Sequence, residues 1–274
     1  MIVLYLLITA LLLLAFLMRP HRRHPLWSKL EGLRYAHRGL HDVEAGIPEN
    51  SMPAVQAALD KGFAIELDVH LLADGSLAVF HDNDLKRVCG ADVPVKELTA
   101  QRLKDYPLLG GNGAYIPLFE EVLALVSDRI PLLIELKVED NNEAALTDAV
   151  MAALKDWNGV YIIQSFSTEA ITYLRKCYPG VPRGLLCTYF MRNRDRESPW
   201  RAWYVLKYWL MCTVHARPDF ISHMWKDPSA HYLRQRCRKQ GIRTFCWTIR
   251  DSQTMLDLEQ QGSAVIFEGF VPEG

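Results

Sequence analysis

The stretch AIELDVHLLADGSLAVFHDND, residues 64–84, carries the pattern from which the fold can be inferred. Its first half has the apolar, β-branched character of a strand, and a second strand follows the turn at Asp74-Gly75. Successive side chains of a strand point to opposite faces, so a strand that enters a core should be apolar at alternate positions. Here one alternating set includes Glu66 and Asp68, so two carboxylates face the same way on a strand that otherwise has a buried composition.

Similar strand segments are distributed along the chain, and helix-period stretches lie between most of them. One such stretch can be capped by Asn50 or Ser51 and ends before Gly62. Eight strands joined by crossover helices over about 240 residues predict a (β/α)8 TIM barrel. A doubly wound open sheet is the alternative. The predicted strands are Arg34–Gly39, Ala64–Leu72, Leu132–Lys137, Val160–Phe166, Arg183–Cys187, Asp219–Met224, Arg243–Ile249 and Ala264–Glu268. The predicted helices are residues 51–61, 142–156, 167–178, 228–240 and 251–261.

Residues 83–117 do not fit a regular strand–helix repeat. They contain a glycine-rich run at residues 110–113, and residues 95–104 have helical character. We therefore expect a short insertion after the second strand and its hairpin, placed at the rim of the site.

Residues 1–18 differ from the rest of the chain because they contain no charged residue, glycine or proline. An apolar run of this length is at the short end of a transmembrane helix. A signal peptide normally has its positive charge before the apolar run, whereas here basic residues follow it. We expect a single-pass membrane anchor at residues 1–18, a basic linker at 19–33 and the barrel domain at 34–274. The positive-inside rule places that domain in the cytoplasm; a cleaved signal peptide is the alternative.

The composition of the whole chain excludes some partners. Its 274 residues carry a formal net charge of −1, so no overall field attracts nucleic acid, and there is no zinc-finger spacing. The six cysteines form no CxxC motif, which suits a reducing compartment. We expect no nucleic-acid partner, and the sequence leaves the oligomeric state open.

The segment 199–218 is rich in tryptophan and tyrosine and has few charges. Aromatic residues of this kind favour a membrane interface, so residues 199–211 can provide a second membrane contact. The alternative is an outer helix of the barrel that packs on the sheet.

Polar side chains interrupt the predicted strands near their carboxyl ends, where a TIM barrel places its chemistry. Buried carboxylates that converge without a partner are costly, and three of them do not ionise together without a cation. Glu66, Asp68 and Glu135 can therefore supply oxygen ligands to Mg²⁺, Ca²⁺ or Mn²⁺. The polar set at the strand ends is His37, Arg38, Glu66, Asp68, His81, Glu135, Lys137, Gln164 and Trp247.

The remaining charges of this set suit a phosphate substrate. Arg38 and Lys137 supply positive charge to a phosphate group, and His37 and His81 can exchange protons near neutral pH. Several residues have a simpler interpretation. The two carboxylates of residues 64–72 can lie on a solvated edge strand, the acid and the lysine of LLIELK can form a local ion pair, and His81 can cap a turn.

Four motifs in order, AHRG, PENS, IELDVHLLADGSLAVFHD and LLIELK, resemble those of the glycerophosphodiester phosphodiesterase family. The similarity is plain over residues 34–170 and fainter to the end. It implies a metal-dependent barrel that hydrolyses a glycerophosphodiester to glycerol 3-phosphate and an alcohol in lipid metabolism. One histidine would take a proton from the glycerol 2-hydroxyl, which attacks phosphorus, and the other would protonate the leaving alkoxide. A cyclic phosphate would then be opened by water.

The resemblance also assigns roles to individual residues. It implies that His37 and His81 are the acid–base pair, that Glu66, Asp68 and Glu135 bind one divalent cation, and that Arg38, Glu49, Asn50, Lys137, Gln164 and Trp247 bind substrate and phosphate. The chain departs from the family near its end, where AVIFEGFVPEG has Glu268 at a position usually occupied by aspartate. We therefore leave Glu268 out of the expected site.

Two alternatives of function stay open from the sequence. The first is a lysophospholipase D activity on lysophospholipids, which would use the same barrel. The second is a catalytically silent, membrane-bound module that binds phosphodiesters. The sequence does not fix the alcohol, the metal ion or the order in which the two histidines act.

Overall fold

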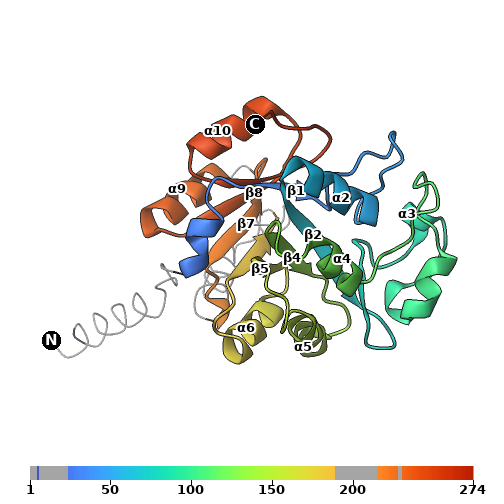
Figure 1. The fold of residues 1–274 in the computed structure, drawn as a ribbon. Helices are drawn as coiled ribbons and strands as arrows, with labels where there is room; N and C mark the ends of the chain where they lie inside the picture. The colour runs from blue at the N-terminus through green and yellow to red at the C-terminus, as the bar shows by residue number, and fades with distance from the viewer. Residues whose placement is uncertain (1–4, 6–23, 189–214, 228–229, 274) are drawn as a thin grey trace, which may run out of the picture.

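The computed structural model describes residue 5 and residues 24–188, 215–227 and 230–273. Eight parallel strands form a barrel, and it closes because β1 pairs with β2 as well as with β9. The TIM-barrel prediction is confirmed, and the open-sheet alternative is wrong (Figure 1). The barrel strands are β1 (Arg34–His37), β2 (Ala64–Leu71), β4 (Leu132–Leu136), β5 (Tyr161–Ser165), β6 (Arg183–Cys187), β7 (Phe220–Met224), β8 (Arg243–Ile249) and β9 (Ala264–Phe267).

The described helices cover the outside of the barrel (Figure 1). Three of them start where the sequence provides a cap, because Ser51, Ser167 and Asp251 accept amide hydrogen bonds at the starts of α2, α6 and α10. The left-handed Gly62 ends the first of these helices. The helices on the barrel are α2 (Met52–Lys61), α4 (Phe119–Val126), α5 (Glu143–Ala153), α6 (Thr168–Cys177), α9 (Ala230–Gln240) and α10 (Ser252–Gln260).

Helix α4 was not among the predicted helices. It buries Phe119, Val122, Leu123 and Val126, which is the i, i+3, i+4, i+7 pattern of one helix face. The signal was therefore present, but the helix is only 8 residues long and follows directly on the irregular insertion.

Two apolar layers explain the alternation along the strands. One cluster consists mainly of strand residues, including Tyr35, Leu133, Phe245 and Ile266, and it fills the barrel interior. The neighbouring positions join a second cluster that also contains residues of the helices. Because side chains alternate, the interior series continues toward the carboxyl ends as polar residues. They are His37, Glu66, Asp68, Glu135, Gln164, Trp247 and Glu268.

The amino-terminal end of the barrel interior is closed by a short 3-10 helix, η1 (Pro25–Lys29), within the segment predicted as a linker. Trp27 is buried there, and its ring meets Phe220 edge-on at 6.0 Å between centroids. Gly184 makes room for the same ring, because a Cβ at that position would lie 2.0 Å from a Phe220 ring carbon. The apolar rings therefore fill this end of the barrel interior, and the polar interior series lies at the opposite, carboxyl-terminal mouth.

The hairpin and the insertion lie beside that mouth. Strand β3 (Leu77–Val79) pairs antiparallel with β2, as the turn between them predicts. The following segment contains α3 (Lys86–Cys89) and two 3-10 helices, η2 (Val95–Glu97) and η3 (Ala100–Asp105), with a small core of their own. Short 3-10 turns thus stand where we expected helical character at residues 95–104.

Two predictions concern residues that the structure does not describe. The first is the membrane anchor at residues 1–18, of which only Tyr5 is described. The second is the aromatic segment 199–218, most of which lies within the undescribed residues 189–214. Among the described residues, no helix has the length and apolar character that a membrane crossing requires.

Candidate active site

Three buried carboxylates meet at the carboxyl-terminal mouth of the barrel. Glu66, Asp68 and Glu135 are 2 %, 1 % and 6 % exposed, and one ligand oxygen of each lies within 4.8 Å of the others. The strand register produces this grouping, because Asp68 of β2 lies opposite Glu135 of β4. The alternative of a solvated edge strand is therefore wrong.

The electrostatics of this carboxylate cluster are unbalanced. Burial and repulsion from Asp68 raise the pKa of Glu135 to about 7, and burial with the same repulsion raises the pKa of Glu66 well above its usual value. Burial alone would also raise the pKa of Asp68, but the charges of Lys137 and Arg38 hold it below its usual range. The cluster can carry its full negative charge only beside additional positive charge.

Lys137 and Arg38 supply part of that charge. The Nζ atom of Lys137 lies 2.8 Å from Glu135 Oε1 and 3.5 Å from Asp68 Oδ1. The local ion pair considered from the sequence exists, but Lys137 also reaches the second strand. Arg38 lies on the other side, with Nε 3.5 Å from Asp68 Oδ2 and Nη1 donating to Glu49 Oε1 at 2.7 Å. A phosphate group between these two cations would be held from two directions.

The AHRG turn places Arg38 by an unusual backbone conformation. Arg38 has φ +56° and Asn50 has φ +50°, both in the left-handed region that costs roughly 1–3 kcal/mol for such residues. The amide of Asn50 donates to the Arg38 carbonyl at 2.9 Å and ties the two positions together. Gly39 is also required, since a Cβ there would lie 2.8 Å from the Ala54 Cβ. Backbone strain of this kind is typical of positions fixed for function.

Two residues of the PENS motif have different roles, one as a helix cap and one as a hydrogen-bond donor in the site. The Ser51 hydroxyl caps α2 by accepting from the Ala54 amide at 3.2 Å. Asn50 is thereby free for another role, and its Nδ2 donates to Asp68 Oδ2 at 2.9 Å. The sequence left the choice of cap between these two residues open.

Two amide oxygens at the site have no hydrogen-bond donor among the described residues. Gln164 donates through Nε2 to Glu66 Oε1 at 3.2 Å, and its Oε1 accepts nothing from any residue that the structure describes. The buried Oδ1 atom of Asn50 likewise accepts no hydrogen bond from any described residue. A set of three carboxylates beside unsatisfied amide oxygens fits a hard divalent cation and its bound water or hydroxyl ligands.

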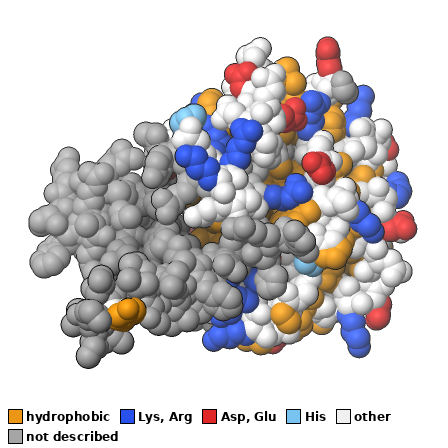
Figure 2. All heavy atoms as spheres, turned by 90° about the vertical axis from the view of Figure 1, so that its left-hand side faces the viewer, with side chains coloured by type: hydrophobic (Ala, Val, Ile, Leu, Met, Phe, Trp, Pro, Cys, Tyr) orange, Lys and Arg blue, Asp and Glu red, His pale blue; other side chains and the backbone are white. Residues whose placement is uncertain are grey.

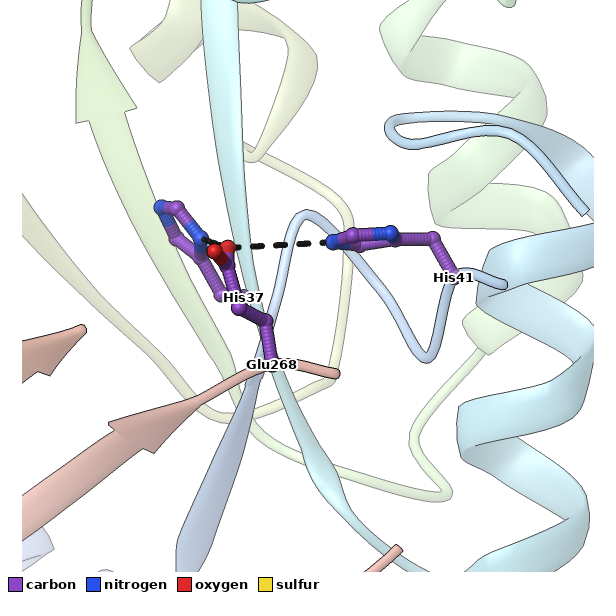
Figure 3. Close-up of side chains that lie close together, drawn as sticks. All are labelled: His37, His41 and Glu268. Carbon is purple, nitrogen blue, oxygen red and sulfur yellow. Dashed lines mark hydrogen bonds and ion pairs between the residues drawn. The ribbon is translucent and has the colours of Figure 1, made fainter. Parts of the chain in front are cut away.

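His37 lies at the end of β1, opposite Glu66 in the register. Its Nδ1 atom is hydrogen-bonded to Glu268 Oε2 (Figure 3). Its Nε2 atom lies 4.0 Å from Glu66 Oε2. Burial lowers the pKa of His37 below its ordinary value, against the opposing effect of Glu268. The ring therefore favours the neutral form, which is the form of a general base.

His81 follows β3 and is more exposed, with a third of its side chain (33 %) accessible. Its Nδ1 atom lies 2.6 Å from Asp82 Oδ1, so the adjacent aspartate orients the ring rather than leaving it as a simple turn cap. The buried His70 donates to the His81 carbonyl at 3.3 Å and supports the backbone of the same loop.

A chain of charged contacts links the two sides of the mouth. Arg87 of α3 donates to Glu49 Oε1 at 2.6 Å and to Asp82 Oδ2 at 2.6 Å. Since Glu49 also binds Arg38 and Asp82 also binds His81, the insertion connects Arg38 to the second histidine.

A cavity of about 330 Å³ opens next to Lys137. It is lined by Asn83, Glu135, Leu136, Lys137, Val138, Ser165, Phe166 and Ser167. The Phe166 ring meets Trp247 edge-on at 6.0 Å, and the buried Trp247 Nε1–H has no acceptor among the described residues. This side of the mouth combines aromatic surface with an unused donor, as a substrate pocket requires.

Sequence reasoning placed these residues but missed several of their partners. The missed residues are His41, Asp82, Arg87 and Glu268. Asp82 could have been predicted as a partner of His81, because it is the next residue in the sequence. Glu268 could have been predicted to face the site, because it continues the inward-facing alternate positions of the last strand. Arg87 carried no such signal, because it contacts Glu49 across 38 positions of the chain.

A parallel barrel that gathers carboxylates, histidines and cationic side chains at the carboxyl ends of its strands has the arrangement of a TIM-barrel enzyme. The sequence model of the Glycerophosphoryl diester phosphodiesterase family matches residues 37–271. The chain therefore belongs to this family and is a phosphodiesterase, so the enzyme prediction is confirmed.

Individual relatives agree with this assignment. A glycerophosphodiester phosphodiesterase of Caldanaerobacter subterraneus subsp. tengcongensis is 28 % identical over 235 residues, 82 % of this chain and 89 % of that protein. Human lysophospholipase D GDPD1 is 30 % identical over 144 residues, 47 % of this chain and 44 % of that protein. The fold is similar to that of an Oleispira antarctica phosphodiesterase solved with the product sn-glycerol-3-phosphate, with TM-score 0.73, 22 % identity and coverage of 88 % and 94 %.

Proposed function

We propose that this enzyme hydrolyses glycerophosphodiesters to sn-glycerol 3-phosphate and an alcohol, with a divalent cation bound by Glu66, Asp68 and Glu135. The carboxylate cluster carries the proposal: three buried acids lie within 4.8 Å of one another, and the pKa values of two of them are raised. A cation at this position would offset negative charge on the phosphoryl oxygens and acidify a bound hydroxyl group. Oxygen ligands accommodate Mg²⁺, Ca²⁺ or Mn²⁺.

The side chains of the protein supply the proton transfers. One of His37 and His81 removes the proton of the glycerol 2-hydroxyl as it attacks phosphorus, and the other protonates the departing alcohol oxygen. The two exchange roles when water opens the cyclic phosphate. Arg38 and Lys137 hold the phosphate between the two rings, and each can donate charge-assisted hydrogen bonds to it.

The direct test is product release from glycerophosphocholine by the purified full chain. We expect sn-glycerol 3-phosphate and choline, a loss of turnover in EDTA, and recovery on addition of Mg²⁺, Ca²⁺ or Mn²⁺. His37→Ala and His81→Ala should each lower kcat about 10²- to 10⁴-fold. His231→Ala, on the exposed side of α9, is the matched control. Turnover that EDTA leaves unchanged would contradict the cation, and turnover that survives His37→Ala would remove this residue from the acid–base pair.

A lysophospholipase D activity is the second candidate. The similarity to human lysophospholipase D GDPD1 supports it, as does Phe166, which is 48 % exposed beside the cavity and offers apolar surface to an acyl chain. Comparison of glycerophosphocholine with lysophosphatidylcholine separates the candidates, because the second substrate would release lysophosphatidic acid and choline. A preference for the lysolipid that Phe166→Ala abolishes would favour this activity.

The location of the enzyme rests on sequence alone. We propose that residues 1–18 anchor the chain in a membrane with the barrel in the cytoplasm, because the basic residues follow the apolar run. The face of the barrel on which α9 lies carries scattered Lys and Arg side chains on its described surface (Figure 2), which is compatible with nearby anionic headgroups. Fractionation of the full chain against a chain that lacks residues 1–18 tests the anchor, and equal recovery of both in the soluble fraction would contradict it.

A further inference from the structure

The position excluded from the site on sequence grounds lies in contact with a catalytic histidine. The Glu268 carboxylate lies between two histidine rings, and Oε2 is hydrogen-bonded to His37 Nδ1 (Figure 3). The Nε2 atom of His41 is 3.8 Å from the same oxygen. Glu268 is largely buried, with 14 % of its side chain exposed.

Glu268 is itself held in place from two directions. Its amide donates to the Ile249 carbonyl at 3.0 Å, which fixes the backbone against the end of β8. Arg250 donates to the other carboxylate oxygen, Oε1. The carboxylate is therefore anchored by Oε1 and presents Oε2 to the imidazole ring.

This arrangement selects one of the two neutral forms of His37. A carboxylate only accepts hydrogen bonds, so the His37 nitrogen that faces it must carry the proton. That nitrogen is Nδ1, which leaves the lone pair on Nε2. The Nε2 atom is the one that lies on the side of the carboxylate cluster, 4.0 Å from Glu66 Oε2.

We propose that Glu268 is a positioning residue, which holds His37 in the Nδ1–H form and aims its Nε2 atom at the substrate phosphate. The inference rests on the proposed function for its catalytic consequence, but not for the state of the ring. The glutamate is one methylene longer than the aspartate expected from the family resemblance, and it still reaches His37.

A second cation bound by His37, His41 and Glu268 is a different interpretation of the same side chains, whose donor atoms also lie within 4.8 Å of one another. The contact between His37 Nδ1 and Glu268 Oε2 argues against it. These atoms are at direct hydrogen-bond distance, and two ligands of one zinc ion, each about 2.0–2.2 Å from the metal, stand farther apart.

The test combines kinetics and spectroscopy on the full chain. Glu268→Gln keeps the shape of the side chain but adds an amide that can donate to Nδ1 and so favour the wrong ring form. We expect kcat on glycerophosphocholine to fall at least about 100-fold, with KM changed less than about threefold, as for loss of an orienting carboxylate. Glu268→Asp should restore at least about tenfold of that loss. Glu259→Gln, a change at another arginine-paired glutamate on α10, is the matched control and should stay within about twofold of the unaltered enzyme.

Nitrogen-15 NMR of histidine-labelled protein gives a readout that does not depend on turnover. The signals of His37, assigned by comparison with His37→Asn, should show protonated Nδ1 in the unaltered protein and a shift toward protonated Nε2 in Glu268→Gln. Protonated Nε2 in the unaltered protein would overturn the proposal, and so would a Glu268→Gln enzyme that keeps more than half of kcat. If the Gln variant does not fold, the proposal is still tested by the ring form of His37 in the unaltered protein and by the kcat of Glu268→Asp. Absence of turnover on every phosphodiester would contradict the proposed function, while the NMR result would still report on Glu268.

Discussion

At the scale of single residues, the site contains neighbouring carboxyl groups whose pKa values are shifted in opposite directions. Asp68 and Glu66 are two positions apart on β2, yet the pKa of the first is lowered and that of the second is raised. Their different distances from Lys137 and Arg38 account for this, since the two cations lie beside Asp68. Glu66 lacks sufficient neighbouring positive charge, so a bound cation is required for it to ionise.

Glu135 gives a prediction that separates stability from activity. In the absence of a cation, burial and the Asp68 charge raise the pKa of Glu135 to about 7, so its ionisation above pH 7 destabilises the folded state. For a raised carboxyl pKa this cost is absent below the unfolded value and fully present above the folded one. Glu135→Gln should therefore raise the free energy of unfolding at pH 8 in EDTA by about 1–3 kcal/mol, while turnover with Mg²⁺ falls at least about 100-fold. Denaturant unfolding with assays of the same preparations measures both. A variant that is less stable and fully active would contradict this account of the cluster.

At the scale of elements, the strands could be predicted and the contacts between distant elements could not. The boundaries of β6 and β8 agree with the prediction because apolar runs bounded by turn residues mark buried strands. The polar interior positions of β1, β2 and β4 were visible as exceptions to that pattern. Glu268, which contacts His37, and Arg87, which contacts Asp82, were not placed in the site from the sequence. They reach it through the closure of the barrel and the path of the insertion, although the interior alternation pointed to Glu268. Residues 189–214 lie outside the described part, so the membrane contact at residues 199–211 and its alternative, an outer helix of the barrel, stay predictions.

Helix α3 gives the prediction that belongs to this scale. Arg87 joins Glu49 to Asp82, and removal of its guanidinium leaves both carboxylates without this shared partner. Arg87→Ala should lower kcat/KM on glycerophosphocholine about 10-fold through displacement of Arg38 and His81, in the range found for residues that orient ligating or reacting groups. Lys86→Ala, at the exposed neighbouring position, is the control. Equal kcat/KM values for the two variants would show that the insertion does not support the site.

At the scale of the whole molecule, a buried histidine outside the carboxylate cluster couples folding to pH. His223 of β7 donates from Nδ1 to the Met224 carbonyl at 3.3 Å, and its Nε2 lies 3.6 Å from Cys246 Sγ. Burial lowers the pKa of His223 to about 4, against the opposing hydrogen bond to the Met224 carbonyl, and the Arg234 charge adds a smaller lowering. The unfolded chain therefore takes up a proton near pH 6.5, before the folded chain does, and stability is lost as pH falls from about 6.5 to 4.

The size of this effect follows from the shift. Relative to His223→Gln, the unaltered protein should lose roughly 2–3 kcal/mol of unfolding free energy between pH 7 and pH 4.5. The comparison between variants cancels the opposite contribution of the carboxylate cluster, whose raised pKa values stabilise the cation-free fold as pH falls. Urea unfolding at the two pH values measures the difference. A difference between the two proteins that is independent of pH would contradict the assignment of a neutral buried ring.

The central claim is that Glu66, Asp68 and Glu135 converge because a divalent cation binds them. A crystal of the full chain grown with Mn²⁺, with diffraction recorded on both sides of the manganese absorption edge, tests it most directly. The account predicts one anomalous peak at bonding distance from oxygens of all three carboxylates. A crystal of active enzyme with no peak there, or with a peak only at His37, His41 and Glu268, would contradict it.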